Sequence, residues 1–200
     1  MSYTAHPRVR PPRQKRTQVA WERILDAGVS LLEEAGYEGF TIASLCSRAE
    51  VTPPAIYARV QNKQALFFAV FEHGFAPIRE QQRHALEPGR WIQNDAEQVI
   101  RGAIAAIAET SLAHERFLRP VARRAEADAE VAERTREARV GAATRFRELI
   151  ARYPEMLRDT RPERIDACLR IVFASLMARI TPANALDIGT RVSDSEFVAD

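Results

Sequence analysis

The chain has 200 residues, of which 46% are hydrophobic and 28% charged, enough for one or two compact domains with a substantial core. No apolar run reaches the roughly 18 residues that a membrane helix needs, and the N-terminus lacks the apolar region of a secretory signal. We therefore expect a cytoplasmic protein with no membrane partner.

The four histidines and two cysteines are scattered, which predicts no metal site and no cofactor. Cys46 and Cys168 lie far apart in apolar, helical contexts. We expect both to be buried, reduced thiols, with a disulfide or a redox sensor as the alternative.

Positive charge gathers at the N-terminus, although the net charge of the chain is only +2. No acidic residue precedes Glu22. The basic residues of this segment are Arg8, Arg10, Arg13, Lys15 and Arg16. We interpret residues 1–16 as a basic arm that contacts phosphates or a minor groove, and a solvated, disordered tail is the alternative.

Apolar residues recur at helical spacing along the chain, and alternating strand patterns are missing, so the sequence predicts an all-α fold. Gly36 should end the first helix, and Pro120 should kink a later one. The expected helices span residues 17–35, 42–49, 53–60, 63 to a break near 74–77, 78–86, 92–111, 114–125, 128–153 and 162–180. Ser193 begins a capping box that predicts a last short helix, either packed or cut short.

The stretch 40–63 predicts a helix-turn-helix, in which the second helix enters the major groove of DNA. Thr41 is placed to cap the first of its helices, and Thr52 the second. Pro53 takes a first helical position, where no amide is needed. Pro54 also lacks an amide, so the cap bond of Thr52 should go to the amide of Ala55.

The residue types of this stretch suit two kinds of DNA contact. Hydroxyl, phenol and cationic groups suit phosphates, and small apolar groups suit thymine methyls. Arg48 could reach the groove or a phosphate. The expected phosphate contacts are Thr41, Thr52, Tyr57, Arg59 and Lys63, together with Arg13, Lys15 and Arg16 of the arm. The expected base-edge contacts are Ala43, Ser44, Thr52, Pro53 and Ala55.

Residues 17–71 resemble the DNA-binding domain of the TetR/AcrR-type transcriptional regulators. The resemblance rests on the segments ILDAGVSLLEEAGYEGFT and VTPPAIYARVQNKQAL. It implies phosphate contacts at Thr41, Thr52, Tyr57 and Lys63, and groove-facing positions at residues 43–44 and 52–55, Pro54 included. Three features depart from the family pattern and leave the operator sequence open: Glu50 replaces the turn glycine, Arg59-Val60 replaces His-Phe, and Pro54 replaces a small flexible residue.

The helix order after residue 63 is similar to that of the family's regulatory domain. We therefore expect three parts: the arm 1–16, a DNA-binding domain 17–63, and a regulatory and dimerisation domain 64–200. The resemblance implies a ligand pocket, for which the candidates are Trp91, Ile104, Ile107, Phe117, Val121 and Phe146. It also implies a dimer interface, for which the candidates are Ile165, Leu169, Val172, Phe173 and Leu176.

These observations predict a dimeric repressor that a small-molecule effector releases from a palindromic, double-stranded DNA operator. One alternative is a DNA-binding protein of the same fold without a small ligand, controlled by a protein partner. The other is an all-α enzyme. The sequence has no nucleophile–base set, no paired carboxylates in an apolar context and no glycine-rich phosphate loop, so we do not expect an enzyme.

Overall fold

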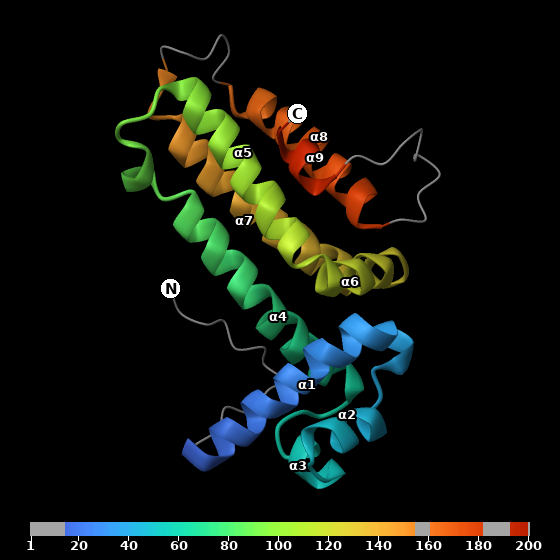
Figure 1. Ribbon diagram of the computed structural model, residues 1–200. Helices are drawn as coiled ribbons and strands as arrows, with labels where there is room; N and C mark the ends of the chain where they lie inside the picture. The colour runs from blue at the N-terminus through green and yellow to red at the C-terminus, as the bar shows by residue number, and fades with distance from the viewer. Residues whose placement is uncertain (1–14, 155–160, 182–192, 200) are drawn as a thin grey trace. The chain divides into compact units, whose positions relative to one another are not determined.

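The computed structural model describes residues 15–154, 161–181 and 193–199 (Figure 1). All secondary structure in these ranges is helical, which confirms the predicted all-α class. None of the helices in the described ranges is long and apolar enough to cross a membrane. The elements are α1 (Lys15–Gly39), α2 (Ile42–Ala49), α3 (Pro53–Tyr57), α4 (Lys63–Ala85), the 3₁₀ turn η1 (Pro88–Trp91), α5 (Ala96–Ala113), α6 (Glu115–Ala127), α7 (Ala129–Ile150), α8 (Pro162–Ile180) and α9 (Asp194–Ala199).

The chain divides into two compact units, Met1–Pro77 and Ile78–Asp200. The boundary lies inside α4, so the N-terminal unit contains more of this helix than the segment 17–63 that the sequence suggested. Each unit has its own set of buried side chains, and we describe them separately.

A cluster of phenylalanine rings fills the N-terminal unit. Phe67 meets the rings of Tyr37, Phe40 and Phe68 edge to face, at centroid distances of 5.1, 5.9 and 5.5 Å. Such pairs add to the free energy of simple area burial. Gly28 on α1 lets the two helices approach closely, because a Cβ atom there would collide with Val70 on α4.

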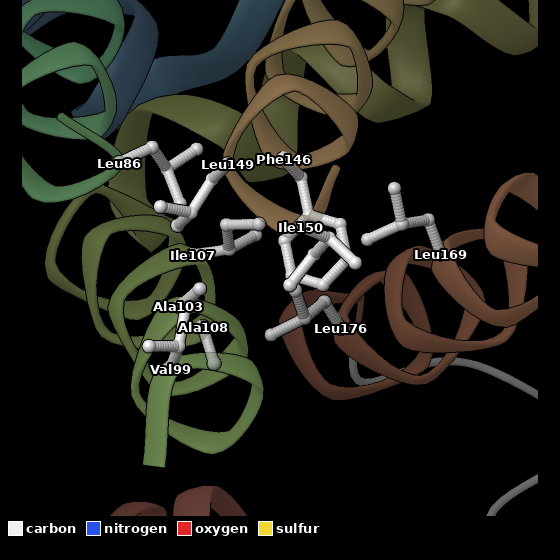
Figure 2. Packing of buried hydrophobic residues seen from close by; sticks show 10 residues of the cluster. All are labelled: Leu86, Val99, Ala103, Ile107, Ala108, Phe146, Leu149, Ile150, Leu169 and Leu176. Carbon is white, nitrogen blue, oxygen red and sulfur yellow. The ribbon is translucent and has the colours of Figure 1, made fainter. Parts of the chain in front are cut away.

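Aliphatic side chains from three helices fill the C-terminal unit (Figure 2). Phe146 on α7 lies between Ile107 on α5 and Leu176 on α8, and Leu149 of α7 lies beside Ile107. All four are at most 5% exposed. The short helix α9 packs against α5, with Phe197 partly buried on this cluster.

The capping box predicted before α9 is present. The Ser193 hydroxyl accepts from the Glu196 amide, and the Glu196 carboxylate accepts from the Ser193 amide at 2.8 Å.

Several helix boundaries differ from the sequence prediction. Gly36 adopts φ +65°, as expected for the end of a helix, yet the chain resumes helical structure to Gly39. The helix α4 continues through Pro77, where a break was expected, because proline removes a single amide while the flanking helical bonds remain. Pro120 lies within α6, as the expected range 114–125 has it. The start of α5 shifts to Ala96 because Asp95 forms a capping box there with Gln98.

The cysteines also differ from expectation. Cys168 is exposed on α8 and Cys46 is half-buried, and both thiols are free. The burial prediction is therefore wrong for Cys168, because it lies on the side of α8 that faces away from the core.

Candidate nucleic-acid interface

The helix α2 begins at the predicted cap. The amide of Ser44 donates to the hydroxyl of Thr41 at 3.0 Å, and the two hydroxyls are 2.8 Å apart. Glu50, in place of the glycine, adopts a left-handed conformation with φ 54° and ψ 48° and ends this helix. Replacing glycine with Glu50 has therefore not changed the turn to a conformation that other residues prefer, because Glu50 keeps the left-handed conformation that glycine adopts most readily.

The start of α3 differs from the prediction in one respect. The hydroxyl of Thr52 makes no cap bond; the amide of Ala55 instead donates to the backbone carbonyl of Thr52 at 2.9 Å. The predicted side-chain cap is wrong because Pro53 and Pro54 offer no amide, and the first available amide already has a backbone partner. The Thr52 hydroxyl is left at the exposed surface.

The burial pattern separates an inner from an outer face of this motif. Leu45 and Ile56 are fully buried, so the helices are held from within. Tyr57 is 50% exposed. The other predicted contact residues of the motif are exposed or half-buried: Thr41, Ala43, Ser44, Thr52, Pro53, Pro54, Ala55, Arg59 and Lys63. The structure therefore places these candidates on the outer part of one continuous segment.

Lys63 lies over an aromatic ring. Its Nζ is 4.5 Å from the centroid of Tyr37, and Tyr37 packs on Phe67. The adjacent Asn62 caps α4 by accepting from the amide of Ala65 at 2.8 Å. The cap and the ring together hold the start of α4 and orient the ammonium group. No spacing rule of the sequence links Tyr37 to Lys63.

Arg48 has an acidic partner in α1. Its guanidinium donates to both carboxylate oxygens of Glu34, at 2.6 and 2.5 Å. This pairing raises the pKa of Arg48. It also engages both terminal nitrogens of the guanidinium, which the sequence had suggested for a contact with DNA. Arg48 therefore forms an ion pair that links α2 to α1.

The arm can be placed only in part. Arg13 lies outside the described residues, while Lys15 and Arg16 form the first turn of α1. The expected arm of residues 1–16 therefore overlaps the beginning of a helix.

Four of the six predicted ligand residues are deeply buried in the C-terminal unit, namely Ile107, Phe117, Val121 and Phe146. Trp91 is half-buried, and its indole donates to the carbonyl of Ala85 at 3.0 Å. A Cβ atom at Gly102 would collide with this indole, so Trp91 has a packing role. Ile104 packs at the margin of the core.

The predicted dimer residues also pack within the chain. Leu169 and Leu176 are 2% and 1% exposed, so the expectation that they form an interface is wrong. Ile165, Val172 and Phe173 are half-buried against the same core. The pattern misled because α8 is apolar on more than one side; the side that remains exposed contains Ile171, at 68%.

A groove does occur in the C-terminal unit, between α7 and α8, with a volume of about 620 Å³. None of the six predicted ligand residues lines it. Its lining residues are Arg136, Arg139, Val140, Ala143, Arg147, Asp166, Leu169, Arg170, Phe173, Ala174 and Met177.

A capped helix, a tight turn and a second short helix with a small exposed face form a helix-turn-helix, the structural class of many DNA-binding proteins. Residues 24–70 match the family described as "Bacterial regulatory proteins, tetR family". Residues 24–70 therefore resemble the DNA-binding domain of this family, as the sequence predicted.

Curated relatives match the same region. The chain is 30% identical over 70 residues to the A-factor receptor protein of Streptomyces griseus, which is 35% of this chain and 25% of that protein. It is 38% identical over 63 residues to the tetracycline repressor protein class G of Vibrio anguillarum, 32% of this chain and 29% of that protein. The chain therefore spans about a quarter of the length of these relatives.

Solved structures extend the likeness in fold to nearly the whole chain. A TetR family transcriptional regulator from Thermus thermophilus, PfmR, aligns with a TM-score of 0.63 at 19% identity, over 88% of this chain and 93% of that one. A TetR-like transcriptional regulator from Rhodococcus aligns with a TM-score of 0.61 at 17% identity, over 95% and 94%. At these identities the likeness establishes the fold.

Proposed function

We propose that this chain is a transcriptional regulator that binds a double-stranded operator through α2 and α3. The observation that carries the proposal is the helix-turn-helix itself. Its hydrophobic residues are buried, its turn and first cap are formed, and its small and hydroxyl side chains lie outside. In this proposal α3 enters the major groove, and Thr41, Tyr57 and Lys63 contact phosphates.

The exposed base-reading residues are small and apolar, led by Pro53 and Ala55. They offer methyl contacts and lack the Arg–guanine and Asn–adenine pairings. Specificity should therefore depend on thymine methyls and on DNA shape.

The regulator should act as a homodimer, because a palindromic operator requires two recognition helices. The exposed side of α8 is the better candidate for the contact between copies. Cys168, Ile171 and Ser175 are exposed there at helical spacing, and Ile171 is a large apolar side chain. Ile171→Asp should convert the dimer to a monomer in sedimentation. A dimer that persists would exclude this face.

Repression relieved by a small molecule is the expected mode of action. It draws support from the two curated relatives, one called a repressor and the other a receptor. The effector would shift the population of conformations so that the two recognition helices no longer match the half-sites, with α4 as the moving element.

Selection from random double-stranded DNA with the full chain tests the proposal. We expect enrichment of an inverted repeat with half-sites about 10 base pairs, or a multiple, apart. Failure to enrich any sequence at both low and moderate salt would refute DNA binding.

The selected site then tests the phosphate contacts. Lys63→Ala should weaken binding to all sequences alike and lower the slope of log affinity against log salt by about one. Lys63→Arg keeps the charge and is the matched control.

Tyr57→Phe should weaken DNA binding without unfolding the N-terminal unit, because Tyr57 is half exposed.

A further inference from the structure

The groove between α7 and α8 lies within the C-terminal unit, where the two helices run side by side (Figure 1). Its volume, about 620 Å³, is in the range of sites that take small organic molecules. On α7 its lining recurs at positions 136, 139, 140, 143 and 147, and on α8 at 166, 169, 170, 173, 174 and 177. Each set is one face of a helix, so the groove is a continuous feature of both.

The charges along this groove are strongly unequal. Four arginines and a single acid, Asp166, line it. Arg147 is neutralised by Asp166, at 2.8 Å, and Arg136 is paired with Glu133, at 2.7 Å. Arg139 and Arg170 make no hydrogen bond or ion pair with another residue in the part of the chain that the structure describes. The groove therefore carries two positive charges that no described acid balances.

Arg139 is the more telling of the two. It is half-buried on α7, and burial, followed by the nearby charge of Arg136, lowers the pKa of its guanidinium. A desolvated cation beside another cation is costly unless an anion joins it. A planar guanidinium matches a carboxylate with two parallel hydrogen bonds.

The remainder of the lining is apolar. Leu169 is buried at the base, Phe173 and Met177 are half-buried, and Val140 is 45% exposed. A bare inorganic anion would leave this surface in water, whereas a ligand with an apolar body would cover it. The arginines and the apolar residues of the groove together favour one kind of ligand, an acid group attached to a hydrocarbon.

We propose that the α7–α8 groove binds an amphipathic monocarboxylate, with its carboxylate on Arg139 and Arg170 and its apolar body along Val140, Phe173 and Met177. Ile171 does not line the groove. A dimer contact through Ile171 and a ligand in the groove are therefore compatible. The role of this ligand as the effector rests on the function proposed above; its binding does not.

Calorimetric titration of the full chain with decanoate, below the concentration at which it forms micelles, tests the binding. Decanol, with the same chain length and no charge, and sulfate, with charge and no tail, are the comparison ligands. We expect decanoate to bind at least about tenfold more tightly than either, the factor that one charge-assisted hydrogen bond provides. Equal affinity for decanol or for sulfate overturns the proposal.

Two variants locate the site. Arg139→Gln should weaken decanoate binding about tenfold or more, whereas Arg145→Gln, on the same helix but outside the groove, should leave it within twofold. Val140→Asp, at an exposed position, should abolish binding by repulsion while the melting temperature stays close to that of the parent. Unchanged binding in Arg139→Gln or Val140→Asp overturns the assignment. Loss of self-association in Val140→Asp, with no decanoate binding in the parent chain, would also overturn it and assign the groove to a second copy.

The effector role has its own readout. Decanoate should release the parent chain from its selected DNA site but should not release Arg139→Gln. If the chain selects no DNA yet binds decanoate through Arg139, the proposed function fails and the binding site stands. If DNA is bound and decanoate is not, the binding site fails and the proposed function stands.

Discussion

The two units of this protein are built on different kinds of packing, and their sites follow from it. The N-terminal unit packs aromatic rings around Phe67, and its outer residues are placed by local caps and a turn. The C-terminal unit packs aliphatic side chains from α5, α7 and α8, and its groove forms where two long helices meet. A site whose residues are placed by local caps and turns can be predicted from the sequence. A site that forms where two helices pack together cannot, because the sequence does not show which helix faces meet.

The largest expected effect compares the two cores. Phe67→Ala should lower the free energy of unfolding of the N-terminal unit by about 3–5 kcal/mol, and Leu149→Ala that of the C-terminal unit by about 2–5 kcal/mol, through lost burial and the cavity left behind. The chain's two tryptophans, Trp21 and Trp91, lie one in each unit. Urea unfolding followed by fluorescence in Trp91→Phe and Trp21→Phe backgrounds therefore reports each unit separately. A loss below about 1 kcal/mol for either variant would contradict the packing described.

The next effect tests the close approach of α1 to α4. Gly28→Ala should cost about 1–3 kcal/mol, because the new methyl group collides with Val70 and outweighs the helical preference of alanine. Gly89→Ala is the matched control, since a Cβ atom there meets nothing within 4 Å. Val70→Ala should partly rescue Gly28→Ala in a double-mutant cycle; strict additivity would argue against the collision.

A smaller effect separates the two threonines of the helix-turn-helix. Thr41→Ala should destabilise the N-terminal unit by about 1 kcal/mol, because it removes the bond to the Ser44 amide. Thr52→Ala should change stability by less than about 0.5 kcal/mol, because its hydroxyl makes no cap bond. Both should weaken DNA binding. Equal stability losses of the two variants, measured by thermal unfolding, would contradict the finding that only Thr41 makes a side-chain cap bond.

The smallest effect concerns a cap in the C-terminal unit and depends on pH. Burial acts to raise the pKa of Asp128, but the amides of Val131 and Glu130 and the guanidinium of Arg124 donate to it and hold the pKa below its ordinary value of 3.8. A depressed pKa stabilises the folded state above the unfolded pKa, and that stability is lost as pH falls through the folded pKa.

Asp128→Asn should therefore cost about 1 kcal/mol or less at neutral pH, and the difference from the parent should narrow below about pH 4. Glu126→Gln, an exposed carboxylate on α6, is the control and should change stability little at either pH. A difference that stays constant from pH 7 to pH 3 would remove the ionised carboxylate from the explanation.

Residues whose roles depend on neighbours in the chain were predictable. The cap at Thr41 and the capping box at Ser193 each involve groups within four residues of each other. The helix α8 begins and ends where the pattern indicated, at Pro162 and Ile180. Predictions failed where a residue contacts a segment that is distant in the sequence.

Three such cases involve partners distant in sequence. Arg48 is paired with Glu34, fourteen residues away, and so is drawn away from the DNA role that its helix suggested. Leu176 is buried by α7 and not by a second copy. Arg139 was not singled out at all, because a helical arginine is usually solvated, whereas here it is half-buried and lines the groove between α7 and α8.

By itself, then, the amino-acid sequence determined most of the helices, the cap at Thr41 and the order of the helix-turn-helix, because these depend on bonds between near neighbours. It also predicted candidate DNA contacts at Tyr57 and Lys63, through the resemblance of one segment to the TetR/AcrR type. Only the tertiary structure decided that Lys63 lies over Tyr37, and that α7 and α8 leave an arginine-lined groove between them. The physical reason is that burial and charge pairing depend on which faces meet in space, and helical periodicity leaves several such faces equivalent.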